Sequence, residues 1–266
     1  MVKNIIIAFL VFITLAFTQA EKYYVTFVKG NVQLERTKKN VKVGDVLTAN
    51  DKLIFTDKAA KVSCISPGKG RFDINAQAIK AGAKGELLAV LKSSLVPASG
   101  TYHLSTRSLM FEGHDPATYF TSVETQGRIL LIKDEPLAIK PSYKLDAKNF
   151  FFIQYIADGK TVVRKVQHDN GSIQFSDKLF VTDSGTLIGK ADLCYQSNAS
   201  GTARSTIIAS FMPIMASKSE IQEQINLIAD HLDKTDKKKL KTEITRHLFD
   251  NYGKIAAEEL TRLFGL

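Results

Sequence analysis

The first strong pattern of apolar positions lies at the start of the chain. An almost unbroken apolar run covers residues 5–17, follows the basic Lys3 and leads through small residues to Ala20. A positive start, a short apolar stretch and small residues at the cut are typical of a secretory signal peptide. A membrane-spanning helix needs roughly 20 apolar residues, more than this run provides. The pattern predicts a signal peptide at residues 1–20, cleaved after Ala20, and an exported product that is periplasmic or secreted. An uncleaved anchor is the alternative.

The next part of the chain alternates between short apolar runs and turn residues. Runs rich in β-branched and aromatic residues predict strands at residues 23–28, 32–34, 53–55 and 61–65. The apolar positions of residues 83–95 are spaced instead as on one helix face, and Pro97 would end that helix. We therefore expect a small β module at residues 21–96, closed by a short helix, and a linker at residues 96–100.

The clearest pattern in the second part of the chain is a hairpin. Two apolar, β-branched runs at residues 150–156 and 161–166 flank Ala157-Asp158-Gly159-Lys160. Asp-Gly suits a two-residue hairpin turn because both positions need a positive φ. Further strands are expected at residues 128–133, 172–175, 192–196 and 205–212. Together they predict an antiparallel β-sandwich-like domain at residues 101–216.

After Ala216 the apolar positions recur every three or four residues, as on amphipathic helices. Ser217 or Ser219 can cap the first helix, and the second should start after Thr235 or Asp236. Gly253 should interrupt the second helix. The apolar positions of the three helices are Ile221, Ile225, Ile228 and Leu232; Leu240, Ile244 and Leu248; and Ile255, Leu260, Leu263 and Phe264. The chain is thus predicted to be mainly β, with an α-helical C-terminal segment at residues 217–266.

Glycine and apolar spacing in the first module resembles the FecR-like periplasmic β domain, named after the ferric citrate uptake regulator. The residues that carry the resemblance are Gly30-Asn31-Val32, Val43-Gly44-Asp45-Val46-Leu47, Lys52-Leu53-Ile54-Phe55-Thr56 and Ala60-Lys61-Val62. The family's Asp-Gly turn before the next strand is replaced here by the longer segment 66–72. The resemblance implies a small β module whose corners use glycine for a positive φ. Regulators of this family also carry a cytoplasmic domain before a transmembrane helix, whereas four residues precede the apolar run here, so we expect the module alone.

Charge and cysteine content bear on partners and on compartment. The chain has 36 basic and 27 acidic residues, a formal net charge of +9. A basic balance favours anionic surfaces such as lipid head groups or acidic polysaccharide, and export argues against nucleic acid. Lysine that merely keeps the surface solvated is the alternative. Cys64 and Cys194 lie in separate strand-like runs, so we expect two separate buried thiols, with one bridge between them as the alternative.

The sequence contains no pattern that predicts a catalytic, cofactor or metal site. None of the five histidines stand three or four residues apart, the spacing of a metal pair on a helix. His114 and Asp115 are adjacent, so in an extended segment their side chains would point apart, and a polar turn led by Asp115-Pro116 is favoured. The serine-hydrolase elbow and the phosphate-binding loop do not occur in the sequence. We expect a non-catalytic protein, although distant residues can also assemble a catalytic site.

Three groups of residues are candidates for binding. One flanks a glycine-rich turn whose backbone N–H groups could hold an anion, one is a lysine cluster suited to acidic lipid or protein, and one is an apolar helix stripe. They are Lys69 and Arg71; Lys237, Lys238, Lys239 and Lys241; and Ile221, Ile225 and Ile228. For these groups the alternatives are a solvated turn, a solvated helix connection and packing inside the chain.

These observations predict a non-catalytic exported envelope protein that binds another protein or an anionic envelope polymer. A periplasmic sensor or regulator of a transport-linked signal is one alternative, and it requires a retained N-terminal helix. A cell-wall-polymer hydrolase with dispersed catalytic groups is another, and it requires a polar cleft holding a carboxyl group of raised pKa.

Overall fold

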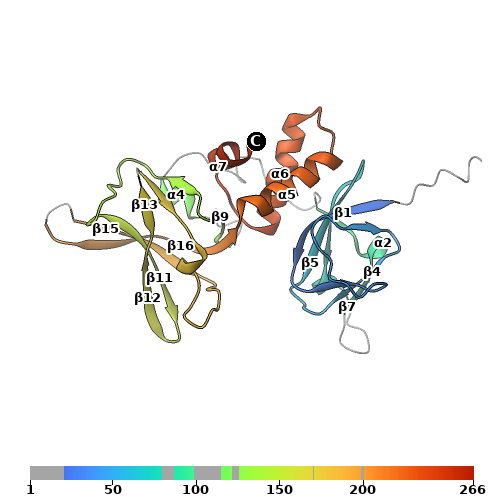
Figure 1. The fold of residues 1–266 in the computed structure, drawn as a ribbon, viewed down its shortest axis with the longest axis horizontal. Helices are drawn as coiled ribbons and strands as arrows, with labels where there is room; N and C mark the ends of the chain where they lie inside the picture. The colour runs from blue at the N-terminus through green and yellow to red at the C-terminus, as the bar shows by residue number, and fades with distance from the viewer. Residues whose placement is uncertain (1–20, 80–86, 99–114, 122–125, 170, 199–200) are drawn as a thin grey trace, which may run out of the picture. The chain divides into compact units, whose positions relative to one another are not determined.

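A computed structural model shows a mainly β chain with several antiparallel sheets and a short helical C-terminal segment (Figure 1). The structure describes residues 21–79, 87–98, 115–121, 126–169, 171–198 and 201–266, so the expected signal peptide lies outside the described residues. The chain forms two compact units. The first comprises residues 1–102 with 230–232, and the second comprises 103–229 with 233–266. Among the described helices, none has both the length and the hydropathy of a membrane span.

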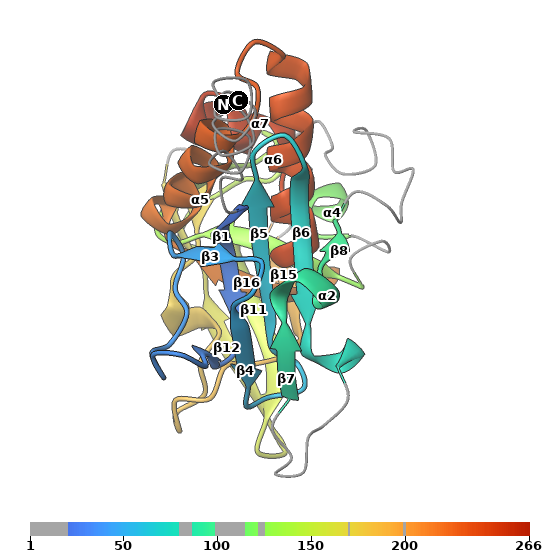
Figure 2. The same ribbon diagram turned by 90° about the vertical axis from the view of Figure 1, so that its right-hand side faces the viewer.

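The first unit consists of two antiparallel sheets that share one core. The five-stranded sheet has the order β3-β1-β5-β6-β8, and its strands are β1 (Lys22–Lys29), β3 (Val46–Thr48), β5 (Lys61–Ser66), β6 (Gly70–Asn75) and β8 (Val96–Pro97). The three-stranded sheet, β2-β4-β7, contains β2 (Val32–Leu34), β4 (Lys52–Phe55) and β7 (Leu87–Val90). Figure 2 shows β5 and β6 side by side. The four strands predicted in this unit are confirmed. Val25, Phe55 and Val62, from three different strands, meet in its core.

Two local predictions in the first unit are wrong. The helix expected at residues 83–95 is replaced, within the described residues, by β7 and a single helical turn, α2 (Leu91–Ser94). Antiparallel pairing with β4 buries Ala89 and leaves Leu88 and Val90 exposed, so tertiary pairing imposes a period of two on this segment. The expected long turn at 66–72 is also shorter, because Arg71 and Phe72 already lie in β6.

The second unit is built on a five-stranded sheet of order β12-β11-β15-β16-β9. Its strands are β9 (Arg128–Ile132), β11 (Phe150–Ala157), β12 (Lys160–Lys165), β15 (Ala191–Ser197) and β16 (Arg204–Ala216). A three-stranded sheet, β10-β14-β13, contains β10 (Pro136–Ala138), β13 (Gln167–Asp169) and β14 (Ser172–Gln174). The short helix α4 (Pro116–Tyr119) adds Tyr119 and the following Phe120 to the core. All the strands predicted for this part of the chain are confirmed.

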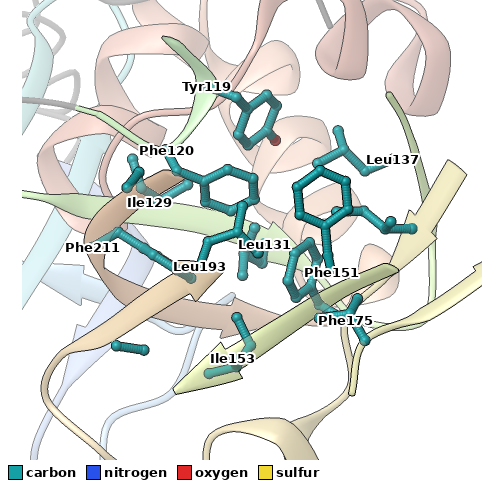
Figure 3. Close-up of a cluster of buried hydrophobic side chains, with 14 of the residues drawn as sticks. Tyr119, Phe120, Ile129, Leu131, Leu137, Phe151, Ile153, Phe175, Leu193 and Phe211 are labelled. Carbon is teal, nitrogen blue, oxygen red and sulfur yellow. The ribbon is translucent and has the colours of Figure 1, made fainter. Parts of the chain in front are cut away.

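Strand pairing in the second unit differs from the antiparallel prediction at one edge. β9 pairs with β16 in parallel, with Leu130 opposite Ile214. Parallel neighbours need a long connection, and here the chain between residues 132 and 204 supplies it. Figure 3 shows Phe151, Ile153, Leu193 and Phe211 among the buried side chains of this core.

The predicted hairpin of β11 and β12 is confirmed, including its turn. Asp158 and Gly159 have φ values of 51° and 72°, as a two-residue turn with both central residues left-handed requires. Ala157 pairs directly with Lys160 across the turn, and the register continues to Phe152 opposite Lys165. Figure 1 shows the two strands lying side by side.

Three helices end the chain, as predicted: α5 (Lys218–His231), α6 (Lys237–Asn251) and α7 (Ala257–Phe264). The Ser217 hydroxyl accepts from Glu220 N at 3.1 Å, and the Asp236 carboxylate accepts from Lys239 N at 2.9 Å. Both oxygens satisfy backbone donors that have no partner inside the helix. Leu232 and Ile255 lie just outside the helices to which the sequence pattern assigned them.

A tight backbone contact joins the C-terminal helices to the sheet of the second unit. Between α6 and α7, Lys254 N donates to Arg128 O at 3.0 Å and Leu130 N donates to Lys254 O at 2.8 Å. Gly253 has a φ of 117°, and a Cβ there would lie 2.5 Å from Arg128 O. Only glycine fits this approach. The segment therefore extends the sheet beside β9.

Candidate binding surface on the second unit

One face of the five-stranded sheet in the second unit points away from its core. Side chains alternate along β11, so Phe151, Ile153 and Tyr155 enter the core while the residues between them face the opposite way. The strand register extends this second face over β12, β15 and β16. We call it the outer face. It comprises Phe152, Gln154, Ile156, Thr161, Val163, Lys165, Asp192, Cys194, Ile207 and Ser210.

Aliphatic side chains of the outer face are exposed. Ile156 is 78% exposed, and Val163 and Ile207 are each 58% exposed. Ile207 lies beside Cys194, which lies beside Phe152, and these last two residues are buried on the same face. A single exposed aliphatic residue is ordinary, but several on one sheet face form an apolar surface of the kind that proteins use for recognition.

A groove of about 700 Å³ adjoins the outer face at the hairpin end of β11. One wall carries Gln154, Ile156 and Asp192, and the other is the loop 182–190, on which Leu187 is 68% exposed. Hydrogen bonds to loop hydroxyls hold this wall, including one that the backbone N–H of Thr186 donates to Thr182 Oγ1 at 3.0 Å. The groove thus combines aliphatic groups with polar hydroxyl and amide groups.

β12 forms one edge of the sheet and carries several basic residues. Within the described residues it pairs with β11 alone. Arg164 is already engaged, since its Nε donates to Tyr155 Oη at 3.0 Å and its Nη2 to Asp183 Oδ1 at 3.1 Å. These hydrogen bonds raise its pKa, that from Tyr155 most strongly. Lys165 Nζ lies 4.0 Å from the centre of the Phe150 ring, which places this cation over the sheet edge.

The sequence did not lead us to the outer face, although it holds a signal for it. Residues 150–156 read Phe-Phe-Phe-Ile-Gln-Tyr-Ile, apolar at almost every position. A strand with one solvated face normally alternates apolar and polar residues. A strand of an antiparallel hairpin that is apolar on both faces therefore indicates a second apolar surface opposite the core.

The structure does not assemble the binding candidates near the glycine-rich turn. Lys69 Nζ forms an ion pair with Glu21 Oε1 at 2.6 Å, and this contact lowers the pKa of the Glu21 carboxyl group. Arg71 is only 4% exposed. The turn therefore does not present two open cations to an anion.

The candidates in the C-terminal helices have two different outcomes. Ile221, Ile225 and Ile228 are buried, which agrees with packing inside the chain and leaves no exposed apolar stripe for a partner. Lys237, Lys238 and Lys239 are exposed in the first turn of α6, and Lys241 is half-buried. The lysine cluster is thus present on the surface as a group of three.

A polar network joins α5 and α6 where their buried sides meet. His247 Nε2 lies 2.8 Å from Gln224 Oε1, and Asn251 Nδ2 lies 3.2 Å from His247 Nδ1. Because the Asn251 amide group is a donor, Nδ1 accepts and Nε2 carries the proton. Gln224 Nε2 donates to Tyr252 Oη, which donates to Glu220 Oε1 at 2.7 Å. Burial, followed by the contact with Glu220, raises the pKa of Tyr252.

The remaining sequence candidates have structural explanations. His114 lies outside the described residues, and the Asp115 carboxylate caps α4 by accepting from Ala117 N at 3.0 Å. Cys64 and Cys194 are both free and buried, as expected for separate thiols. Burial, with a smaller effect of Asp73, raises the pKa of Cys64 to about 12. Among the described residues no three potential metal ligands cluster together.

Carboxyl groups bear on the hydrolase alternative, which needs one of raised pKa. The structure lowers the pKa of Glu21, Asp51, Asp146 and Asp233. For Asp51, burial opposes the shift, but hydrogen bonds from Thr48 and Arg36 outweigh it. Hydrogen bonds from Lys148 N and the Asn149 side chain stabilise the ionised form of Asp146. These four carboxylates are thus held ionised, the opposite of what a general acid needs.

Comparison of the chain with protein-family models, with curated proteins and with solved structures found no match. The fold therefore defines the class of this protein as a mainly β chain of two units with a helical C-terminal segment. The resemblance of residues 30–62 to the FecR-like domain stays a prediction.

Proposed function

We propose that this is an exported, non-catalytic binding protein that recognises another protein through the outer face of its second unit. The observation that carries the proposal is the group of exposed aliphatic side chains Ile156, Val163 and Ile207 on one sheet face. Covering such a side chain completely contributes about 1.5–3 kcal/mol. The outer face can therefore supply the apolar centre of an interface.

The side chains of this surface favour a protein over a sugar polymer as the partner. Sugar hydroxyl groups placed against Ile156, Val163 and Ile207 would lose hydrogen bonds to water without replacement. Aliphatic side chains of another protein would lose nothing comparable. The adjoining groove, with Gln154 and Asp192, then supplies hydrogen bonds at the rim, as in ordinary protein interfaces.

Paired substitutions on the full mature chain test this proposal. Val163→Asp and Ile207→Asp place a charge in the apolar centre, whereas Val96→Asp changes a comparably exposed valine, 52% exposed, in the first unit. Each tagged variant would be expressed in the native host and captured from the envelope fraction. We expect one protein to co-purify with the wild-type chain and with Val96→Asp, and at least tenfold less of it with the two outer-face variants. Equal recovery with all four chains would refute the proposal.

A second candidate is an anionic envelope polymer or lipid at the start of α6. Lys237, Lys238 and Lys239 are exposed there, and the first turn contains no acidic residue. Such binding would weaken steeply with salt. Sedimentation with anionic phospholipid vesicles should fall at least tenfold when all three lysines are changed to glutamine. Unchanged sedimentation, or equal binding to neutral vesicles, would exclude this candidate.

A further inference from the structure

We infer that the partner of the outer face binds as an extended, acidic strand that pairs with the free edge of β12. This inference rests on the proposed function and specifies its partner chemistry. In the part of the chain that the structure describes, β12 is a terminal strand of its sheet, and its side chains alternate between exposed and half-buried over most of its length. An edge strand presents backbone donors and acceptors that an incoming strand can use.

The hairpin register identifies the backbone groups that point outward. In a hairpin with a two-residue turn, the residues that close the turn, Ala157 and Lys160, form a hydrogen-bonded pair. Hydrogen-bonded and non-hydrogen-bonded pairs alternate along antiparallel strands. The bond from Val166 N to Phe151 O, 2.9 Å long, agrees with this alternation, because Val166 and Phe151 are each six residues from the pair that closes the turn. The N–H and C=O groups of Thr161, Val163 and Lys165 must therefore point away from β11.

The same three residues also belong to the outer face. Thr161, Val163 and Lys165 are exposed, and their side chains lie beside Ile156, Gln154 and Phe152 of β11, respectively. A strand bonded to these backbone groups would place every second side chain on the outer face, next to Val163. Backbone pairing and apolar contact would thus be made by one segment.

Charge selects among the strands that could bind at this edge. Lys160 and Lys165 lie at the two ends of β12, and both are exposed. A second copy of β12, paired antiparallel about Val162, would place Lys160 opposite Arg164 twice. Like charges directly opposite each other destabilise a pair of strands. A strand that places aliphatic side chains on the outer face beside Val163 and carboxylates on its other face, opposite Lys160 and Arg164, fits the edge instead.

Proline provides a selective test of backbone pairing. Because Val163 N–H points away from β11, Val163→Pro removes an outward donor and leaves the hydrogen bonds of the hairpin intact. Val163→Thr is the matched control, since it keeps both the N–H group and a β-branched side chain. Thermal unfolding monitored by circular dichroism should show the hairpin variants to be folded.

The probe is a soluble ten-residue peptide of alternating valine and glutamate, added to the full mature chain at neutral pH. We expect backbone hydrogen exchange at Thr161, Val163 and Lys165 to slow at least tenfold with this peptide. A peptide of alternating valine and lysine should have no effect. Equal protection by both peptides, or by neither, would overturn the inference.

Capture of the native partner separates failure of this inference from failure of the proposed function. We expect Val163→Pro to reduce capture at least tenfold and Val163→Thr to preserve it. If Val163→Pro retains the partner while Ile207→Asp loses it, the outer face binds without strand pairing and the inference is wrong. If every variant retains the partner, the proposed function is wrong as well.

Discussion

Two regions of the second unit reverse the usual placement of apolar and polar groups, in opposite senses. The outer face exposes Ile156, Val163 and Ile207, whereas the contact between α5 and α6 buries Gln224 and His247. The buried polar groups have hydrogen-bond partners inside the chain. The aliphatic groups of the outer face are instead exposed, without cover from the part of the chain that the structure describes. The buried polar groups are thus explained by stability, whereas the exposed aliphatic groups form the surface for which we propose a partner.

Removing the His247 side chain should disrupt the buried polar network between α5 and α6 and cause the largest loss of stability. His247→Leu leaves Gln224 Oε1 and Asn251 Nδ2 without the ring that they contact. An unsatisfied buried polar group costs about 1–3 kcal/mol, so we expect a loss of about 2–5 kcal/mol in the free energy of unfolding. Urea unfolding of the purified chain measures it, and a loss below about 1 kcal/mol would contradict the structural role.

Substitutions on the outer face should leave stability almost unchanged and weaken partner capture instead. Ile207→Ser removes exposed aliphatic surface, so we expect the free energy of unfolding to change by less than about 0.5 kcal/mol. Partner capture should nevertheless fall severalfold, because the lost surface would be buried in the complex. A large loss of stability in the same urea titration would show that the residue belongs to the fold rather than to a binding site.

Asp51 in the first unit is a buried charged group that also has its hydrogen-bond partners inside the chain. Its buried carboxylate accepts from Thr48 N at 2.8 Å and from Arg36 Nε at 2.9 Å. Its folded-state pKa is lowered, so its contribution is complete above the unfolded value of about 4 and is lost as pH falls through the folded value. Asp51→Asn should lower stability by about 1 kcal/mol at pH 7. The difference in melting temperature from wild type should shrink below pH 4; a difference independent of pH would argue against this role.

Replacing a lysine at the edge of β12 should have the smallest effect, a modest loss of affinity for the acidic peptide. Lys160→Gln removes one exposed charge while keeping a long side chain, so we expect the acidic peptide to bind about two- to fivefold more weakly at low salt, as suits an exposed ion pair of 0.2–1 kcal/mol. The difference should disappear at 1 M salt, where screening is nearly complete. Titration at the two salt concentrations measures it, and equal weakening in both would mean that the charge is not involved.

Local chemistry made much of the fold predictable. Asp158-Gly159 located the hairpin turn, and apolar periodicity located the three C-terminal helices, including the start of the second after Thr235 or Asp236. Residues 87–90 could not be assigned correctly, because pairing with β4, more than 30 residues earlier in the chain, decides their conformation. The parallel pairing of β9 with β16 is non-local in the same way.

The candidate site was harder to predict than the fold. Charge and helix periodicity directed attention to Arg71 and Ile225, which the structure buries. Exposure depends on how distant strands pack, and spacing within a segment does not reveal it. The register that places Ile207 beside Cys194, and Cys194 beside Phe152, emerges only in the folded sheet.

Site-specific photo-crosslinking in the native host tests the outer face most directly. A photoreactive amino acid would replace Val163 in one chain and Val96, in the first unit, in another. We predict that position 163 forms one discrete crosslinked product with another protein and that position 96 does not. Absence of that product at position 163, in a chain that is exported and folded, would contradict a protein-binding role for this surface.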